Sequence, residues 1–439
     1  MDSKHRTGAT GACSGDVTGL GTHHETKGPP RDRLDRPIRV PEDQRVTATR
    51  RPNLPTWYSR PGSRGWRCAP APAGIRGFHA ELPDHAVTPL VELPPLAGEL
   101  GVRRVFVKDE SLRLGLPAFK ALGASWAVAS VIAQRAGLTG PLTLAGLRVA
   151  VAHNQVTLVT ASDGNHGRAV ARIAAQLGLR ARVFVPEVIS AGAAAAIAAE
   201  GATVTTVPDT YDHTVQQAAV AAAADPAAVL VQDTARPGYE QIPGWIVQGY
   251  DTLLAEVDDQ LQAAGAEQPD LVVVPVGVGS LAQAVVTHYR SGQHITPPSV
   301  LSVEPDTAAC VLRSLTNGSA LSVQTAATTM AGLNCGTPSS LAWPYLHQGL
   351  DAAVAVTDGA ATRAVKDLAR LGVSSGPSGA ATLAGVRAAL TGESSNRRRT
   401  DLGISADSVV VLLSTEGTDS TVDPAIAPPA ASQASKDGS

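Results

Sequence analysis

Short apolar runs alternate with alanine-rich stretches along most of the chain. Three alanine-rich stretches have the length of helices: 118–137, 167–178 and 190–201. The apolar runs have the length and β-branched content of strands, and they occupy 102–109, 155–162, 180–187, 203–208, 227–233, 270–277, 300–305 and 409–417. Several contain an unbroken apolar core, which is typical of strands buried on both faces. Their alternation with helices predicts an α/β fold with a mostly parallel, helix-covered sheet.

Both ends of the chain and one internal stretch lack this alternation. Residues 1–55 are rich in Gly, Thr, Arg and Pro without periodicity, and residues 421–439 have a similar character. Such segments bury too little apolar surface to offset the entropy lost on ordering. We expect both ends to be disordered, and we expect 391–403, with its three consecutive arginines, to form a solvated loop.

Composition narrows the class of protein. The 439 residues carry a net charge of −3, which provides no basic field for nucleic acid. The four cysteines are scattered without zinc-site spacing, and no apolar run reaches the roughly 18 residues of a membrane span. The N-terminus shows no apolar signal segment. We therefore expect a cytoplasmic protein that binds neither nucleic acid nor membrane and holds no metal.

The stretch TASDGNHGRAVA follows one of the apolar runs and precedes a helical pattern. Its two glycines permit a tight turn and a close approach of the backbone to a flat ligand. Asn165 offers an amide donor, and Asp163 places a carboxylate at the mouth of the same loop. The pattern also suits an ordinary helix start capped by Ser162 or Asp163, so the stretch alone leaves both interpretations open.

A second glycine-containing loop, Gly277 to Ser280, lies between an apolar run and a helical stretch. N–H groups at a helix N-terminus form an anion site when glycines allow a ligand to come close, and phosphate is the expected guest. The same residues, with Ala282, match GxGxxA, and Glu304 ends the next apolar run. That arrangement is also the fingerprint of a dinucleotide-binding fold, in which the acid binds the ribose hydroxyls. Dinucleotide binding is therefore a competing interpretation of this loop.

Lys120 decides between these interpretations. It is embedded in the apolar stretch LGLPAFKALGASW, although lysine is among the residues least often buried. A nicotinamide-binding fold has no role for such a lysine or for a second glycine loop carrying an asparagine. A cofactor with an aldehyde, a ring oxygen and a phosphate needs an amine, an amide donor and an anion site. We therefore expect pyridoxal 5'-phosphate, held as a Schiff base by Lys120.

The apolar run at 409–413 ends in Ser414 and Thr415. A hydroxyl beside the pyridine nitrogen leaves that nitrogen largely neutral, whereas an aspartate would hold it protonated and make the ring a stronger electron sink. The weaker sink favours loss of a β-leaving group over transamination. The pair therefore indicates β-elimination or β-replacement, although two hydroxyl residues at a strand end are unremarkable by themselves.

In order along the chain, AFKALG, SDGNHGR, GVGS and STEG resemble the fold-type-II pyridoxal-phosphate enzymes, the tryptophan synthase β-like group. More narrowly, QDTARPGYEQIPGWIVQGY and MAGLNCG resemble the diaminopropionate ammonia-lyases, and threonine and serine dehydratases lack both. The resemblance runs from about Gly77 to about Asp419. It implies two open, mostly parallel twisted sheets covered by helices, with the cofactor in the cleft between two domains. The implied division is a smaller domain at about 121–240 and a larger one from 56–120 plus 241–420.

The resemblance also implies roles for individual residues. Lys120 is expected to be the Schiff-base lysine, Asp163 the base for the D-isomer of the substrate, and Asp233 a carboxylate near the substrate's amino groups. The remaining expected cofactor contacts come from three loops and are Asn165, Gly277, Val278, Gly279, Ser280, and Ser414 or Thr415. The implied enzyme is a cytoplasmic homodimer that converts the amino acid 2,3-diaminopropionate to pyruvate and ammonia.

Several positions depart from the pattern of these ammonia-lyases. This chain has Gly-Ala-Ser at 123–125 where Gly-Gly-Ser is expected, and Pro377 where a glutamate is expected. It has Arg236 and Pro237 where a Trp-Glu pair is expected. These changes lie near the expected site, so they bear on the substrate more than on the cofactor. A serine/threonine dehydratase, a dinucleotide-dependent oxidoreductase and a non-catalytic cofactor-binding protein remain alternatives.

Overall fold

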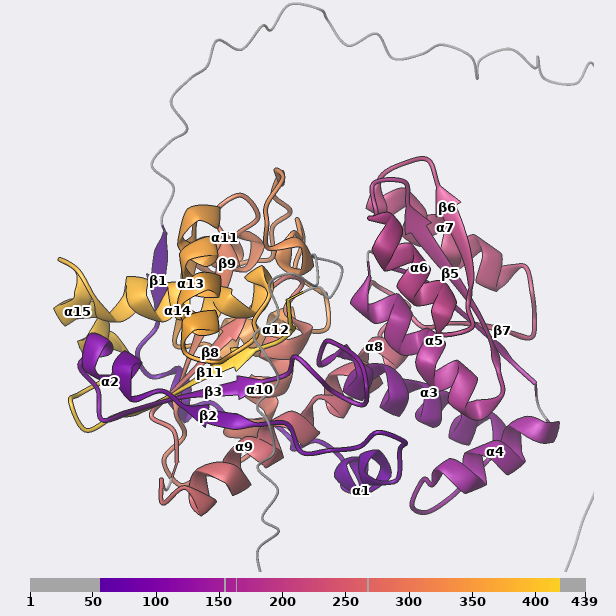
Figure 1. Cartoon of the computed structure of the whole chain (residues 1–439), viewed down its shortest axis with the longest axis horizontal. Helices are drawn as coiled ribbons and strands as arrows, with labels where there is room; N and C mark the ends of the chain where they lie inside the picture. The colour runs from indigo at the N-terminus through magenta and orange to yellow at the C-terminus, as the bar shows by residue number, and fades with distance from the viewer. Residues whose placement is uncertain (1–55, 154, 163, 267, 419–439) are drawn as a thin grey trace, which may run out of the picture. The chain divides into compact units, whose positions relative to one another are not determined.

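The computed structural model describes residues 56–418, except 154, 163 and 267. The expected disorder of 1–55 and 421–439, and the side chain of Asp163, lie outside these residues. Figure 1 shows strands β5 to β7 with helices α4 to α7 on one side, and strands β8, β9 and β11 with α13 and α14 on the other. Two sheets therefore organise the described residues, as expected.

The larger sheet has the strand order β1-β10-β9-β8-β11-β3-β2 within the described residues. Its strands are β1 (Trp57–Ser59), β2 (Leu90–Glu92), β3 (Arg104–Asp109), β8 (Leu271–Pro275), β9 (Ser299–Pro305), β10 (Ala352–Val356) and β11 (Val409–Ser414). The five central strands run parallel, and the short edge strands β1 and β2 pair antiparallel. Short antiparallel edges leave little unpaired backbone for association with other chains.

The smaller sheet has the order β6-β5-β4-β7, and its pairs are parallel throughout. Its strands are β4 (Thr157–Ala161), β5 (Arg180–Pro186), β6 (Thr203–Val207) and β7 (Ala228–Leu230). Each lies within an apolar run expected to form a strand. Parallel neighbours need long crossover connections, and helices occupy those connections.

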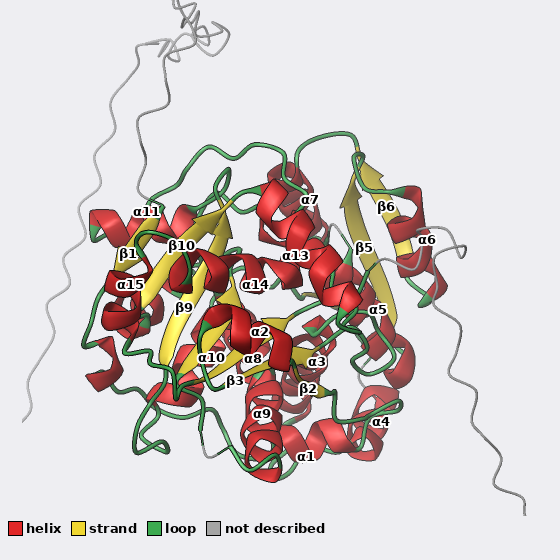
Figure 2. Ribbon diagram, turned by 60° about the vertical axis from the view of Figure 1, so that its left-hand side comes forward, coloured by secondary structure: helices red, strands yellow, loops and turns green. Residues whose placement is uncertain are grey.

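Helices cover both faces of the strands (Figure 2). The α-helices are α1 (Ile75–Ala80), α2 (Pro94–Leu100), α3 (Lys120–Ala136), α4 (Leu144–His153), α5 (Asn165–Leu177), α6 (Ala191–Ala199), α7 (Tyr211–Ala223), α8 (Gln241–Gly249), α9 (Asp251–Ala263), α10 (Ser280–Arg290), α11 (Cys310–Asn317), α12 (Trp343–Gly349), α13 (Asp358–Arg370), α14 (Pro377–Leu390) and α15 (Ser395–Leu402). Two short 3-10 helices, η1 (Ser63–Gly65) and η2 (Ala331–Leu333), complete the assignment. None of the helices in the described residues combines the length and apolarity that a membrane crossing requires.

Strand β11 shows why the central strands are rich in apolar residues on both faces. Val409, Val411 and Leu413 belong to one core cluster together with residues of α10. Val410 and Leu412 belong to another cluster together with residues of α14. Successive side chains point to opposite faces of a strand, so a sheet covered on both faces favours apolar residues at successive positions. Full burial of each such side chain contributes roughly 1.5–3 kcal/mol.

The prediction of a solvated loop at 391–403 is wrong, because α15 spans much of it. The side chain of Arg399 donates hydrogen bonds to the carbonyl oxygens of Leu100 and Leu390, and that of Arg398 donates to the carbonyl oxygen of Ala388. Leu402 is fully buried. The arginines therefore complete the carbonyl ends of neighbouring helices, a contact that local sequence does not reveal.

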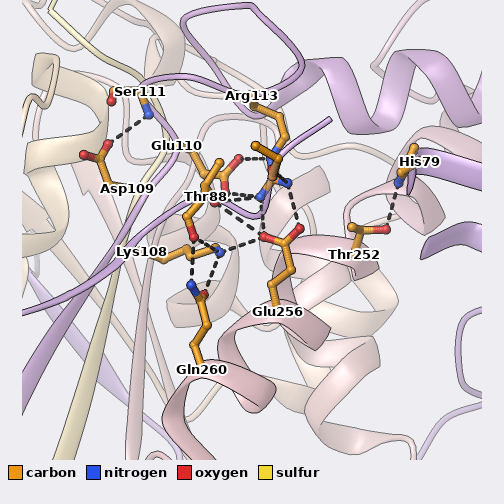
Figure 3. Close-up of polar contacts among 11 residues, drawn as sticks. His79, Thr88, Lys108, Asp109, Glu110, Ser111, Arg113, Thr252, Glu256 and Gln260 are labelled. Carbon is orange, nitrogen blue, oxygen red and sulfur yellow. Dashed lines mark hydrogen bonds and ion pairs between the residues drawn. The ribbon is translucent and has the colours of Figure 1, made fainter. Parts of the chain in front are cut away.

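A buried charged network anchors the segment that leads to Lys120 (Figure 3). Lys108 of β3 donates to Glu256 of α9 at 2.7 Å. Arg113 donates to both Glu110, at 2.6 Å, and Glu256, at 2.7 Å, while Thr88 donates to Glu110. All five side chains are almost fully buried, and two cations face two carboxylates. The network fixes the loop after β3 against α9.

Candidate active site

The sheet topology brings the expected site residues to the carboxyl ends of neighbouring strands. β8, β11 and β3 are consecutive in the larger sheet, and the chain leaving them carries Gly277–Ser280, Ser414–Thr415 and Lys120. β4 and β7 are neighbours in the smaller sheet, and they are followed by Asn165 and Asp233. The carboxyl ends of parallel strands share one edge, which is where open α/β sheets bind their ligands.

A hydrogen bond between Lys120 and Asp233 connects the residues that follow the larger sheet with those that follow the smaller sheet. Lys120 is the first residue of α3, and its Nζ donates a hydrogen bond to Asp233 Oδ2 at 2.5 Å. The side chains are 26% and 12% exposed, so this lysine is not the freely exposed lysine of an amphipathic helix. Burial raises the pKa of Asp233, but the charges of Lys120 and His166 and the hydrogen bonds to the carboxylate together outweigh burial and hold that pKa well below its usual range. Asp233 is therefore an ionised partner for an ammonium group.

Three further side chains surround Asp233. Ser280 donates to the Asp233 carbonyl oxygen at 3.2 Å, which ties the GVGS loop to this aspartate. His166 lies with Nδ1 3.9 Å from Asp233 Oδ2, and its Nε2 is 2.8 Å from the Val231 carbonyl oxygen. Burial raises the pKa of Tyr250, on which the charges of Lys120 and Asp233 also act. The Tyr250 hydroxyl therefore stays protonated beside the ion pair.

The GVGS loop has the backbone geometry of an anion site. Gly279 has φ +100°, a conformation that non-glycine residues rarely adopt, and α10 begins at the next residue. A Cβ on Gly279 would lie 2.5 Å from Leu346 Cδ1, and one on Gly277 would lie 3.0 Å from Cys335 Sγ. A side chain at either position would crowd its neighbours, and at Gly279 the positive φ disfavours other residues as well. The N–H groups at the start of α10 favour an anion.

A polar cluster lies at the end of β11. Glu416 accepts from Asn165 Nδ2 at 3.1 Å through one carboxylate oxygen and from the Ser378 backbone N–H at 3.2 Å through the other. Ser414 Oγ donates to Ser375 Oγ at 2.7 Å. The Ser378 hydroxyl is buried and has no hydrogen-bond partner within the described residues. Segments far apart in the chain thus supply an amide, a carboxylate and hydroxyl groups to one place.

These features fit pyridoxal phosphate. A buried hydroxyl without a partner costs about 1–3 kcal/mol, and a bound polar group at Ser378 would remove that cost. Lys120 supplies an amine, Asn165 an amide and Gly277–Ser280 an anion site. Pro377, at the first turn of α14, leaves no side-chain carboxylate where the resembling enzymes have glutamate, whereas Glu416 approaches the start of the same helix.

Three of these residues, Tyr250, Ser378 and Glu416, were not predicted from the sequence. Each belongs to a stretch that carries the resemblance or a departure from it, but no local feature marks the side chain. Their roles depend on partners from other elements.

In the loop before α5, Ser162 forms the bonds that cap the helix. Ser162 Oγ accepts from the N–H groups of Gly164 at 3.0 Å and Gly167 at 2.8 Å. The loop is therefore a capped helix start, and Ser162 is the capping residue. Asp163 is not needed for these bonds, and its expected role as a base stays a prediction.

The structure weighs against the dinucleotide interpretation. Glu304 is fully buried in β9, and its two oxygens accept from the N–H groups of Val311 and Leu312 at 2.8 and 2.7 Å. Burial raises its pKa to about 8. The carboxyl group is thus occupied with the start of α11 and unavailable to ribose hydroxyls.

Comparisons with known proteins identify the family of the chain. Residues 82–415 match the family described as pyridoxal-phosphate dependent enzyme. Diaminopropionate ammonia-lyase of Salmonella typhimurium is 38% identical over 299 residues, which cover 66% of this chain and 74% of that protein.

Solved structures of the Escherichia coli diaminopropionate ammonia-lyase are similar as well. The complex with D-serine has a TM-score of 0.72 and 34% identity, covering 78% of this chain and 87% of that chain. The complex with an aminoacrylate-pyridoxal-phosphate azomethine reaction intermediate has a TM-score of 0.70 and 33% identity, with the same coverage.

Proposed function

The chain belongs to the family of pyridoxal-phosphate-dependent enzymes, and from this premise we propose that it is an ammonia-lyase acting on 2,3-diaminopropionate. The reaction consumes one water and yields pyruvate and two ammonia. The Lys120–Asp233 pair beside the GVGS loop is the observation that carries the proposal. A buried carboxylate next to the reactive lysine suits a substrate with two amino groups, because charge-assisted hydrogen bonds to ammonium groups are strong.

We assign the binding of the cofactor to residues that surround this pair. Lys120 would hold its carbonyl carbon, Asn165 would donate to its ring oxygen, and the N–H groups of Gly277–Ser280 would bind its phosphate. Ser414 or Thr415 faces the ring nitrogen. When bound, pyridoxal phosphate withdraws electrons from the substrate's α-carbon and so makes its proton removable.

Asp233 controls the protonation of Lys120 in this proposal. A lysine whose ammonium is paired with an aspartate cannot accept a proton. The substrate amine would take the place of Lys120 at the cofactor, which would release Lys120 as a neutral amine, and Asp233 would then pair with an ammonium group of the substrate. The neutral Lys120 amine then takes the α-proton of the L-isomer, and Asp163 takes that of the D-isomer from the opposite face. The D-serine complex of the similar Escherichia coli enzyme is consistent with a site that admits D-amino acids.

Aromatic side chains limit water at Lys120. The rings of Phe119 and Tyr250 lie 4.7 Å apart between centroids, and Tyr250 is fully buried. Exclusion of water strengthens the electrostatic interactions of Asp233.

Two further properties complete the proposal. The smaller lobe at about 121–240 and the larger lobe from 56–120 plus 241–420 enclose the site, and the protein is a cytoplasmic homodimer. The resemblance to the ammonia-lyases and the scattered cysteines support these assignments. Light scattering on the purified protein measures the oligomeric state directly.

A substrate panel tests the function. Purified protein loaded with pyridoxal phosphate is assayed for pyruvate and ammonia with D- and L-diaminopropionate, L-serine and L-threonine. We expect diaminopropionate to have the highest kcat/KM. Higher values for serine or threonine would identify a dehydratase, and release of no ammonia from any of them would support a non-catalytic cofactor-binding protein.

Lys120→Ala tests the assignment of the lysine. The variant should lose turnover and the visible absorption that borohydride shifts in the wild-type protein, while its circular dichroism remains unchanged. Full activity in this variant would refute the mechanism.

A further inference from the structure

Two histidines and an aspartate converge away from Lys120, on three adjacent segments. Asp258 lies on α9, His288 in the last turn of α10 and His294 in the loop that follows. Asp258 Oδ2 is 2.8 Å from His288 Nε2 and 2.9 Å from His294 Nε2. The imidazoles are 7–8% exposed and the aspartate is 29% exposed, so the cluster is enclosed but reachable by an ion.

The hydrogen-bond chemistry requires positive charge at this point. A carboxylate oxygen only accepts, so each nitrogen at 2.8–2.9 Å from it must carry a proton or share a cation with it. His288 also has Nδ1 at 2.8 Å from Asp251 Oδ1. Without a metal, His288 must therefore be an imidazolium with both nitrogens protonated. With a metal, Nδ1–H donates to Asp251 and the lone pair of Nε2 faces the ion.

The surroundings of the cluster match those of known metal sites. A metal-binding histidine usually donates its second ring N–H to a carboxylate, which fixes the orientation of the ring, and Asp251 is placed to accept that bond from His288. Tyr289 donates to the other oxygen of Asp258 at 3.4 Å. His294 Nδ1 is buried with no partner within the described residues, so turning this ring toward an ion breaks only its bond to Asp258.

We propose that Asp258, His288 and His294 bind one divalent transition-metal ion of the zinc type. Two imidazole nitrogens and one carboxylate oxygen suit Zn²⁺ and Co²⁺, whereas Mg²⁺ and Ca²⁺ prefer oxygen ligands. In a zinc tetrahedron the ligand atoms lie about 3.3 Å apart, as follows from metal–ligand distances near 2.0 Å. The observed 2.8 and 2.9 Å need only a small outward rotation of the partly exposed Asp258 side chain.

The site binds the loop after α10 to α9 and leaves the fourth position for water. It lies outside the Lys120–Asp233 pair, so its role is structural. The sequence predicted no metal because the cysteines lack zinc spacing, and an aspartate from an earlier helix forms no local motif with the two histidines.

The experiment uses the full-length holoenzyme without a polyhistidine tag, stripped with EDTA and titrated with Zn²⁺ and Co²⁺. We expect one equivalent of Zn²⁺ per chain, a rise in the thermal midpoint, and visible d–d absorption of Co²⁺. His294→Gln should abolish all three. Asp251→Asn keeps the ligands and should weaken binding by roughly 10–100-fold, the usual effect of losing a carboxylate that orients a ligand. His213→Gln, which removes an exposed histidine paired with Asp209, should change nothing.

Circular dichroism in EDTA establishes that each variant is folded before titration. If wild-type protein takes up no Zn²⁺ and its thermal midpoint is indifferent to the ion, the proposal is overturned and His288 is an imidazolium between two aspartates. Uptake that persists unchanged in His294→Gln and Asp251→Asn also overturns it. If His294→Gln does not fold, the affinity of Asp251→Asn and the wild-type titration decide.

Discussion

Replacing Glu256 with glutamine tests whether the buried network of Figure 3 is held by charge balance or only by hydrogen bonding. Glu256 accepts from Lys108 Nζ at 2.7 Å and from two nitrogens of Arg113 at 2.8 and 2.7 Å. Glutamine has nearly the same shape and keeps one oxygen acceptor. The variant leaves two buried cations against the single carboxylate of Glu110.

The expected cost follows from the burial of all the partners. The side chains of Lys108, Glu110 and Arg113 are 0% exposed and that of Glu256 is 1% exposed. Removing one partner of such a buried ion pair costs about 3–5 kcal/mol, because an uncompensated charge remains away from water. Burial already lowers the pKa of Lys108, and loss of Glu256 lowers it further. The variant therefore loses less stability at pH 9 than at pH 7, because the free energy needed to deprotonate Lys108 on folding is smaller at the higher pH.

The assay is equilibrium unfolding in urea, followed by tryptophan fluorescence and circular dichroism. Glu92→Gln is the matched control, because Glu92 forms a two-bond pair with Arg104 on the adjacent strands but is 38% exposed. An exposed pair contributes about 0–1 kcal/mol. The double variant Lys108→Met/Glu256→Gln restores the balance of Arg113 with Glu110 and should regain most of the stability. Equal losses in Glu256→Gln and Glu92→Gln would refute the reasoning.

Three other changes have defined outcomes. Gly279→Val should weaken pyridoxal-phosphate binding at least about 10-fold, because the valine side chain collides with α12 at the anion site. The control is Gly318→Val, at a glycine with a similar positive φ but open space around it, and it should leave the affinity unchanged. Equal affinities of the two variants in a fluorescence titration would contradict the anion site. Asp163→Asn should reduce kcat for D-diaminopropionate by roughly 10²-fold and spare the L-isomer, so parallel losses on both isomers would exclude the two-base mechanism. Burial lowers the pKa of His79 to about 3, below the 6.5 of an unfolded histidine. As the pH falls, the unfolded state therefore binds the proton before the folded state does. The free energy of unfolding should decrease by about 2 kcal/mol between pH 6.5 and 5. The decrease should be smaller in His79→Gln, and an identical pH profile would show that His79 is not the group responsible.

The alternation of strands and helices was available from the sequence because it depends on neighbouring residues. Strand β11 carries apolar residues on both faces from Val409 to Leu413 because both faces of its sheet are covered, and the sequence shows this run directly. Helix starts and glycine turns are also local, so Lys120, Asn165 and the GVGS loop could be placed at the ends of predicted strands. The chemistry of one cofactor, which needs an amine, an amide donor and an anion site, then grouped them.

Only the tertiary structure decided which of these side chains meet. Lys120 pairs with Asp233, and Asn165 with Glu416, across long stretches of chain whose relative position depends on strand order. Helix α15 forms because Arg399 completes the carbonyl ends of other helices, against the expectation from its composition. Charge pairs and metal ligands act over a few ångströms in space, and a one-dimensional pattern carries no information about such distances until the sheets bring the segments together.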